Sequence, residues 1–509
     1  SSFEEIRAER IKKLEHLRSR GIDAYPVESN PTAPIADVLG SFDSYKEKGG
    51  LTLAGRVRAV RVHGGALFFD LTDGSYQEDR DAPVPPPEAF DTKIQGLLKR
   101  DDIGEEAFAL FEETVDIGDF VEVTGTLFIT KREEKTIAAQ SWRMLAKSLR
   151  PLPDKWHGLQ DVEERFRRRY LDSLMSSDVR RRFVVRGRII KEIRAFLDAA
   201  GYLEVETPIF QPLYGGASAA PFKTHYNALD SDFYLRISDE LYLKRMLIGG
   251  FPRVYEISKD FRNEGVDVTH NPEFTALEFY EAWSDATKQQ VFVEKLVKHV
   301  VQKVFGSSKL TVAESEIDFS KDFARITYSD LLKRYALITD PQHATREEVV
   351  LKANQFGIDA APSDSREKIL DNIYKKVCRP KLIQPTFITD YPTANLPLAK
   401  RSPTNRNNAE VFQLVIAGAE LVKAFSELND PLDQFERLKE QETQGKAGDT
   451  EAQTLDMNFI EAMEYGMPPA GGVGIGIDRL IMVLTDTRNI REIVYFPTLR
   501  PEKPEKPTA

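Results

Sequence analysis

Residues 261–274, FRNEGVDVTHNPEF, combine the residue types that a nucleoside triphosphate requires of its binding site. Arg262 stays charged at any working pH and can pair with an α-phosphate, and His270 can reach another phosphate oxygen. Glu264 can accept a hydrogen bond from the adenine amino group, and Phe274 can stack on the purine ring. A solvated turn between two strands, with Phe274 in the core, would also explain this stretch.

A second candidate stretch, residues 471–485 (GGVGIGIDRLIMVLT), has four glycines in its first six positions. Glycines allow a ligand to approach the backbone closely. The apolar residues that follow predict a helix with Asp478 and Arg479 in its first turn, and a positive helix N-terminus with an Arg suits phosphate. No Gly-Lys-Ser/Thr follows, so this is not a P-loop, and no parallel βαβ unit surrounds it. A packed, glycine-rich start of a helix is the plain alternative.

The elements that must position these residues fall into two groups, and the first is rich in β-strands. Residues 51–145 contain five short β-rich runs separated by glycine turns, with a helix-prone stretch, 101–113, between the third and the fourth. This order is typical of an OB-fold barrel. Residues 75–92 contain several prolines, which cannot donate to a strand pair, and we interpret them as an exposed loop without an assigned function.

The second group begins with a long helix, for which Asp178 is the predicted N-cap and Gly201 the terminator. Residues 202–210 (YLEVETPIF) are predicted to form one strand, which Pro208 ends. Beyond it, strand-like runs do not alternate regularly with helices, which favours an antiparallel α+β fold over a Rossmann fold. We predict an N-terminal helix and OB-fold domain at 1–148, a linker at 149–172, an α+β domain at 173–502 with a helical insertion at about 341–380, and a disordered tail at 503–509.

Composition narrows the classes of protein that the chain can belong to. It has 509 residues, of which 41% are hydrophobic, and this length favours two or more domains. A formal net charge of −11 argues against indiscriminate binding of nucleic acid but allows local basic patches. Cys378 is the single cysteine, so we expect no intrachain disulfide and a reducing, cytoplasmic location. No apolar run approaches the roughly 20 residues of a membrane span, and we expect no membrane partner.

Taken together, these stretches resemble the class II aminoacyl-tRNA synthetases, and the lysyl-tRNA synthetases in particular. Residues 196–210 (FLDAAGYLEVETPIF) resemble motif 1 of the class, residues 261–274 motif 2 and residues 474–480 (GIGIDRL) motif 3. Stretches typical of the lysyl enzymes are GGASAAPF at 215–222, YLRISDELYLKRML at 234–247, FSELNDP at 425–431 and LPDKWHGLQDVEERFRRRYLD at 152–172. The resemblance covers nearly the whole chain, including the barrel.

The resemblance implies a homodimer, formed through motif 1, that catalyses two steps. The carboxylate of lysine attacks the α-phosphate of ATP, giving lysyl-adenylate and pyrophosphate, and lysine then passes to the 3′ end of tRNA(Lys). ATP would arrive with Mg²⁺ as the cofactor. Such chemistry depends mainly on positioning and charge stabilisation. This agrees with the absence of a nucleophile–base pair from the motifs.

The resemblance also assigns roles to single residues. The catalytic cations would be Arg262, His270 and Arg479. ATP would be held by Arg262, Glu264, His270, Asn271, Phe274, Glu420 and Arg479. Lysine would be held by Gly216, Glu240, Arg262, Glu278, Tyr280, Lys423 and Glu427. The anticodon would be read by Arg61, Phe68, Gln95 and Glu134, although Phe68 would also fit the barrel core. The metal ligands would be Gln413 and Glu420.

Two of these positions depart from the family pattern. Gln413 stands where the family usually has a metal-binding Glu, and Lys423 where it usually has an Asn near the lysine carboxylate. Their even spacing would place both side chains on one face of a strand. We therefore hypothesise that Lys423 partly replaces the charge of a missing metal ion; alternatively, it points to solvent and the metal site is ordinary.

Three other functions remain compatible with parts of the sequence. A paralogue that lysylates a translation factor would resemble the catalytic domain alone, and the anticodon-type barrel argues against it. An aspartyl or asparaginyl enzyme would need cations in place of Glu278 and Glu427. A non-catalytic RNA-binding regulator would agree with Gln413 and Lys423 but not with the intact cationic motif residues.

Overall fold

The computed structural model describes residues 2–77, 79, 81–153, 159–362, 364–393, 396–446 and 452–502. The predicted disordered tail, 503–509, lies outside these residues. The chain divides into two compact units, Ser1–Val184 and Val185–Ala509, and the division falls within helix α8 (Ser177–Ala199). The domain limits given above remain a prediction. Among the helices of the described ranges, none is both long and apolar enough to cross a membrane.

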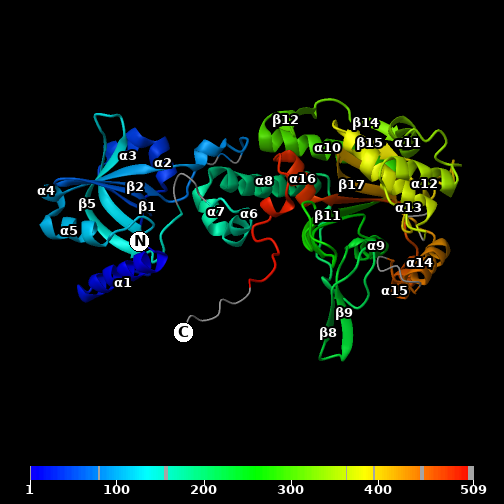
Figure 1. The fold of residues 1–509 in the computed structure, drawn as a ribbon, viewed down its shortest axis with the longest axis horizontal. Coiled ribbons are helices and arrows are strands. Elements are labelled where there is room, and N and C mark those ends of the chain that lie inside the picture. The colour runs from blue at the N-terminus through cyan, green and yellow to red at the C-terminus, as the bar shows by residue number, and fades with distance from the viewer. Residues whose placement is uncertain are drawn as a thin grey trace. The chain divides into compact units, whose positions relative to one another are not determined.

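The first unit contains a closed five-stranded barrel with the strand order β1-β2-β3-β5-β4, as predicted for an OB-fold (Figure 1). The strands are β1 (Leu51–His63), β2 (Ala66–Thr72), β3 (Ile94–Lys99), β4 (Phe120–Ile129) and β5 (Lys135–Ala146). The predicted helix between the third and fourth strands is present as α4 (Arg100–Ile103) and α5 (Glu105–Thr114). The other helices of this unit are α1 (Phe3–Ser19), α2 (Ile35–Gly40), α3 (Phe42–Lys48), α6 (Val162–Arg167) and α7 (Arg169–Met175).

Local sequence explains why this unit forms. Side chains of β1 alternate between buried and half-exposed positions, as expected of a strand with one face on a core. A capping box between Ser2 and Glu5 starts α1, which places Leu14 and Leu17 in the barrel core. The proline-rich segment 75–92 is not simply an exposed loop, because Phe90 is buried and its ring lies 4.4 Å from that of Tyr76.

The second unit is built on an eight-stranded sheet with the order β14-β15-β16-β17-β18-β11-β10-β6. Its central pairs are antiparallel, while the β14–β15 and β10–β6 pairs at its edges are parallel. The strands are β6 (Leu203–Glu204), β10 (Arg253–Phe261), β11 (Glu273–Ala282), β14 (Ala324–Thr327), β15 (Thr386–Thr389), β16 (Val411–Ile416), β17 (Ala419–Ser426) and β18 (Ala470–Gly476). This architecture confirms the predicted α+β class.

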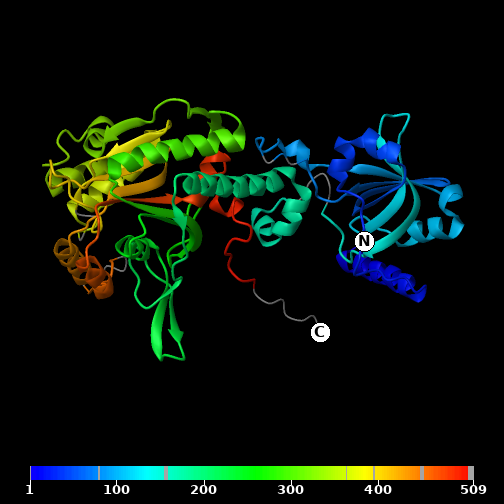
Figure 2. The same cartoon turned by 180° about the vertical axis from the view of Figure 1, so that it is seen from behind.

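Helices cover the sheet on both faces. Successive residues of β18 point to opposite faces, and a Cβ at Gly471 would meet Gln289 of α10 (Ala286–Phe305), while one at Gly472 would meet Tyr280 of β11. Helix α10 therefore covers one face and runs along the sheet (Figure 2). On the opposite face lie Tyr280 and helix α9 (Glu240–Ile248), which contacts β10 and β11.

Smaller elements complete the unit. A three-stranded sheet contains β7 (Phe210–Gln211), β8 (Lys223–Tyr226) and β9 (Ser231–Leu235), and a hairpin contains β12 (Lys309–Val312) and β13 (Ser315–Asp318). The predicted insertion is helical, with α12 (Arg346–Gln355) and α13 (Arg366–Ile373) after α11 (Tyr328–Ala336). The remaining helices are α14 (Pro431–Lys446), α15 (Met457–Glu464) and α16 (Ile477–Leu484).

Two local predictions were wrong. Asp178 is not the N-cap of α8, because the helix already begins at Ser177 and Asp178 lies in its first turn. The stretch expected to be one strand after Gly201 forms two short strands, β6 and β7. Pro208 lies between them and cannot donate a hydrogen bond to a neighbouring strand. Gly201 does end the helical run, with a φ of +79° that favours glycine.

Candidate active site

A cavity of about 380 Å³ opens on the face of the large sheet opposite α10. Its walls come from the loop between β10 and β11, from β11, β17 and β18, and from the first turns of α9 and α16. The predicted ATP- and lysine-binding residues that line it are Gly216, Glu240, Arg262, Glu264, His270, Asn271, Phe274, Glu278, Tyr280, Glu420, Lys423 and Arg479. The structure thus gathers, from segments more than 200 residues apart, the residues assigned to two substrates.

Strand β18 forms the floor of the cavity, and its glycines are needed for that role. A Cβ at Gly472 would lie 2.0 Å from Oε1 of Glu427 and 2.4 Å from the ring of Tyr280. In the strand register, Gly474 lies between Glu278 on β11 and Lys423 on β17. Gly472 therefore leaves room for the side chains of Glu427 and Tyr280, and Gly474 continues the same face of the strand.

One end of the cavity is cationic and aromatic. The Arg262 guanidinium carbon lies 4.9 Å from the centroid of the Phe274 ring, so Arg262 covers the face proposed for adenine. At the start of α16, Arg479 lies 2.9 Å from His270, measured from Nη2 to Nε2. The other ring nitrogen of His270 contacts Asp267 at 2.9 Å. Although burial opposes it, hydrogen bonds from Thr269 and His270 hold the pKa of Asp267 at about 2.

Asp478 connects α16 to α8 and β11. Its Oδ1 accepts a hydrogen bond from Arg186 of α8 at 2.6 Å, and its Oδ2 accepts one from the backbone N–H of Thr275 on β11 at 2.8 Å. Arg186 also donates to the Thr275 hydroxyl at 3.0 Å. This buried network fixes α16, and with it Arg479, against the strand that carries Phe274.

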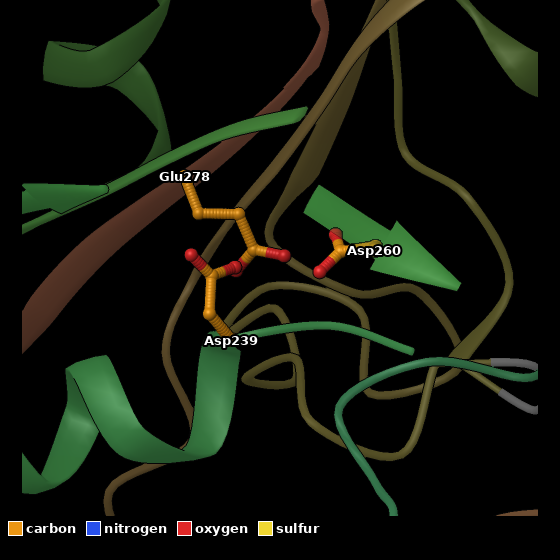
Figure 3. Close-up of side chains that lie close together, drawn as sticks. All are labelled: Asp239, Asp260 and Glu278. Atoms are coloured by element: carbon orange, nitrogen blue, oxygen red, sulfur yellow. The ribbon is translucent and has the colours of Figure 1, made fainter. Parts of the chain in front are cut away.

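The opposite end of the cavity is acidic. Glu278 accepts hydrogen bonds from Ser238 and from the Tyr280 hydroxyl, both at 2.8 Å. Asp239, at the start of α9, and Asp260, on β10, turn their carboxylates toward that of Glu278 (Figure 3), and one oxygen from each of the three lies within 4.8 Å of the others. All three residues are buried.

Buried carboxylates so close together cannot all be ionised. Asp260 is partly neutralised by Arg236, whose Nε lies 3.4 Å from it, yet burial raises the pKa of Asp260 to about 6. Burial and the neighbouring Glu278 raise the pKa of Asp239 well above its usual value. Because Glu278 already accepts two hydrogen bonds that favour its charged form, Asp239 is the acid that holds the proton.

Two predicted lysine ligands meet a cation of the protein itself. The Nζ of Lys244 donates to Oε1 of Glu240 at 2.6 Å and forms an ion pair with Glu427. Glu427 is fully buried beneath Gly472 and is not among the residues that line the cavity. Burial raises the pKa of Glu240 to about 6, with Lys244 opposing the rise.

The prediction for Gln413 as a metal ligand is not supported by its surroundings. Gln413 does not line the cavity, and its Oε1 accepts hydrogen bonds from Tyr374 at 3.1 Å and Tyr391 at 2.5 Å. It is on a different strand from Lys423, although the two are direct partners across β16 and β17 and so share a face. Glu420 does line the cavity, and its carboxylate is a ligand that Mg²⁺ prefers.

The predicted anticodon readers lie together on the outside of the barrel. Phe68 is half-buried, whereas its neighbour Phe69 points to the opposite side and fills the core. Arg61 is directly opposite Phe68 across β1 and β2, and Gln95 on β3 is the diagonal neighbour of Phe68. Glu134 is exposed just before β5. A half-exposed aromatic beside polar groups is suited to a single-stranded base.

Sequence reasoning missed the roles of several residues. It did not single out Asp239, Asp260, Lys244 or Asp267, and it named Asp478 without its network. Only the spacing of Glu240 and Lys244, four residues apart on a predicted helix, could have indicated a contact. The other contacts join segments that are distant in the sequence.

Comparison with known proteins agrees with this geometry. The family model of class II tRNA synthetases (D, K and N) matches residues 161–500, and that of the OB-fold nucleic acid binding domain matches residues 51–145. A lysine–tRNA ligase of Moorella thermoacetica is 44% identical over 499 residues, covering 98% of each chain. Lysine–tRNA ligases of Clostridium novyi and of Roseiflexus sp. (strain RS-1) are each 45% identical, covering 99% and 98% of this chain and 96% and 99% of their own.

Proposed function

The chain belongs to the class II tRNA synthetases of the D, K and N group, and on that premise we propose that it is a lysine–tRNA ligase. It activates L-lysine with ATP and transfers the lysyl group to the 3′ end of tRNA(Lys). The observation that carries the choice of amino acid is the acidic end of the cavity, where Glu240 and Glu278 line the wall and Glu427 is buried beneath Gly472. An aspartate side chain would be repelled there.

In the first step, a carboxylate oxygen of lysine attacks the α-phosphorus of ATP, and the bond to the bridging oxygen breaks to release pyrophosphate. Arg262 holds the α-phosphate and the carboxylate, while His270 and Arg479 stabilise the charge on the departing phosphates. Adenine stacks on Phe274, which requires Arg262 to leave that ring face when ATP binds. In the second step, a terminal hydroxyl of tRNA attacks the lysyl carbonyl and AMP leaves.

The lysine side chain extends toward the acidic end. Glu278, Tyr280 and Glu427 surround the ε-ammonium, and Glu240 with the backbone of Gly216 receives the α-amino group. A cationic side chain in a buried site requires such opposite charge and hydrogen-bond acceptors. The polar pocket also rejects apolar analogues, because they would leave buried carboxylates unpaired.

Mg²⁺ accompanies ATP at the phosphate end. Glu420 would hold it, with phosphate and water oxygens as further ligands, and the ion would neutralise charge that develops on pyrophosphate. Lys423 lines the same cavity and offers a second positive charge in place of a second metal ligand. On this account, Lys423→Asn lowers the rate of pyrophosphate exchange. An unchanged rate and Mg²⁺ titration in Lys423→Asn would contradict this role.

The remaining partners follow from the family. The barrel binds the tRNA(Lys) anticodon, with Phe68 stacked on a base and Arg61, Gln95 and Glu134 as polar contacts.

A homodimer forms through motif 1, where Leu203, Ile209 and Phe210 are exposed by 48%, 44% and 39%. Exposed apolar side chains grouped in this way are typical of a protein interface. The cytoplasm, which supplies ATP and tRNA, is the proposed location.

Amino-acid-dependent exchange of labelled pyrophosphate into ATP tests the activation step. Purified protein with Mg²⁺ should show exchange with L-lysine and none with aspartate or asparagine. Exchange with aspartate would end the assignment of lysine. A protein that binds tRNA(Lys) but shows no exchange with any amino acid would support the non-catalytic alternative.

A further inference from the structure

One lysine side chain of the protein, that of Lys244, is buried behind the acidic end of the cavity. Its side chain is 0% exposed, and it pairs with Glu240, whose side chain is 8% exposed, and with Glu427, which is 0% exposed. The Phe425 ring, 5.5 Å from Nζ, covers another side of the ammonium. Neither Lys244 nor Glu427 lines the cavity, whereas Glu240 does, so Lys244 lies behind the cavity wall rather than in the substrate's place.

The two carboxylates come from separate parts of the fold. Glu240 is the first residue of α9, and Lys244 follows it by one helical turn. Glu427 comes directly after β17, and its backbone N–H donates to Ala470 at the start of β18 at 2.8 Å. Lys244 is therefore the link that sets the separation between a helix carboxylate and a sheet carboxylate.

Resting on the proposed function, we propose that Lys244 is a positioning residue, which favours the ionised forms of Glu240 and Glu427 and sets the spacing between them before the substrate binds. In this role, it prepares the two carboxylates for the α-amino and ε-ammonium groups of L-lysine. It does not touch the substrate. Pre-organised charges of this kind need no rearrangement when the ligand arrives.

Physical chemistry explains why such a cation is needed. Burial disfavours a carboxylate, and a buried carboxylate without a partner takes up a proton. Burial raises the pKa of Glu427 well above its usual value, and Lys244 is the largest influence against that rise. Burial alone would lower the pKa of Lys244, but Glu240 and Glu427 outweigh it and raise the pKa, so the ammonium stays charged.

The positive charge of Lys244 also adjusts the net charge of the pocket to that of the two ammonium groups of lysine. When Glu240, Glu278 and Glu427 are all ionised, Lys244 cancels one of their three negative charges. The two charges that remain match the two ammonium groups of the substrate. Asp239 adds no charge while it holds its proton.

Other charged or titratable groups face these carboxylates and stay in place when Lys244 is replaced. Glu278 and Tyr280 face them from β11, Asp239 from the start of α9, and Lys423 from β17. Asp260, on β10, is paired with Arg236. If Lys244→Met changes the pH dependence of the KM for lysine, the cause is therefore the loss of this one cation, because the neighbouring charged groups are unaltered.

The first test measures the KM for lysine against pH in the pyrophosphate exchange reaction. Lys244→Met retains length and apolar contacts but removes the charge. Without the cation, the pKa of Glu427 should rise above the assay pH, and the KM for lysine should increase about tenfold for each pH unit of that excess. The increase in KM is therefore largest at low pH and becomes smaller as the pH rises. The KM for ATP should stay near that of the unaltered protein, and Lys244→Arg should restore the original pH profile.

A matched control is Lys298→Met on α10. Lys298 also pairs with a glutamate one turn away, since its Nζ lies 2.7 Å from Glu294, and neither residue lines the cavity. This variant should retain the pH profile for lysine. If Lys244→Met lowers activity equally at every pH, or tightens lysine binding, the proposed role is wrong and Lys244 is merely structural or competes with the substrate.

The second test needs neither substrate nor activity. The infrared carbonyl band of protonated carboxyl groups should grow in ligand-free Lys244→Met at neutral pH, and the added intensity should vanish in Lys244→Met/Glu427→Gln. An unchanged band would overturn the proposal even in a protein that activates lysine. Conversely, an absence of lysine-dependent exchange in the unaltered protein would refute the proposed function. The carbonyl band would still test the role of Lys244 in that case. If Lys244→Met does not fold, Lys244→Arg provides the test. The proposal then requires that Lys244→Arg has the same carbonyl band and the same dependence of the KM for lysine on pH as the unaltered protein.

Discussion

At the scale of single residues, the negative charge of Glu427 lies beneath Gly472, at the end of the cavity proposed for the lysine ε-ammonium. Glu427→Gln removes this charge and leaves the phosphate contacts of Arg262 and Arg479 intact. A charge-assisted hydrogen bond is worth about 1.5–3 kcal/mol, so lysine affinity should fall about ten- to a hundredfold while ATP affinity is retained. Calorimetric titration with each ligand measures both values. Equal losses for lysine and ATP would contradict the pocket assignment.

Asp239 predicts a dependence of stability on pH. Its pKa is raised by burial and by Glu278, so the folded protein binds this proton more tightly than the unfolded chain. The free energy of unfolding therefore declines as pH rises from about 3.9, the unfolded value, through the folded pKa. The amide of Asp239→Asn has no such proton to lose. Between about pH 5 and pH 8, the free energy of unfolding of this variant should therefore decline less than that of the unaltered protein. The difference should be about 1 kcal/mol or more, since one pKa unit is about 1.4 kcal/mol.

Urea unfolding at both pH values, without lysine, measures this difference. Asp260, Glu240, Glu278 and Glu427 also have raised pKa values, so part of the decline will remain in the variant. Asp322→Asn, at a side chain that is fully exposed, is the control and should follow the unaltered protein. Parallel declines in all three proteins would show that Asp239 is ionised in the fold.

At the scale of elements, β18 depends on the glycine at position 472. Gly472→Ala would place a Cβ 2.0 Å from Glu427 and 2.4 Å from Tyr280, so both side chains must move. We expect the KM for lysine to rise at least about tenfold, comparable to the loss of the Glu427 contact. Gly187→Ala on α8, where a Cβ meets nothing within 4 Å, should be neutral or slightly stabilising. A normal KM for lysine in Gly472→Ala would refute the close packing above β18.

The elements themselves were largely predictable, and the reason is local. Strands such as β1 show alternation of apolar residues, and glycines mark their turns, so the barrel order could be read from short windows. The glycine run indicated a backbone open to close approach with a helix after it, and β18 followed by α16 has that order and lines the cavity. The contacts of Asp478 and Gln413 could not be found in this way. They join residues far apart in the chain, and only the packed sheet brings them together.

At the scale of the whole molecule, the barrel should affect one reaction step only. Phe68→Ala removes a proposed stacking surface, and the loss of one base stack costs about 1–3 kcal/mol. Charging of tRNA(Lys) at limiting tRNA should therefore fall about five- to a hundredfold. Pyrophosphate exchange without tRNA should stay normal, because the cavity lies wholly within the second unit. A parallel fall in exchange would mean that the substitution merely destabilises the protein.

The central claim concerns which amino acid reaches which acceptor. Its most direct measurement is aminoacylation of purified tRNA(Lys) with labelled amino acids, ATP and Mg²⁺, followed by identification of the ester-linked amino acid. The account predicts that lysine becomes attached to tRNA(Lys), that aspartate and asparagine do not, and that AMP is released in equal amount. Attachment of another amino acid, or activation of lysine without transfer to tRNA, would contradict it.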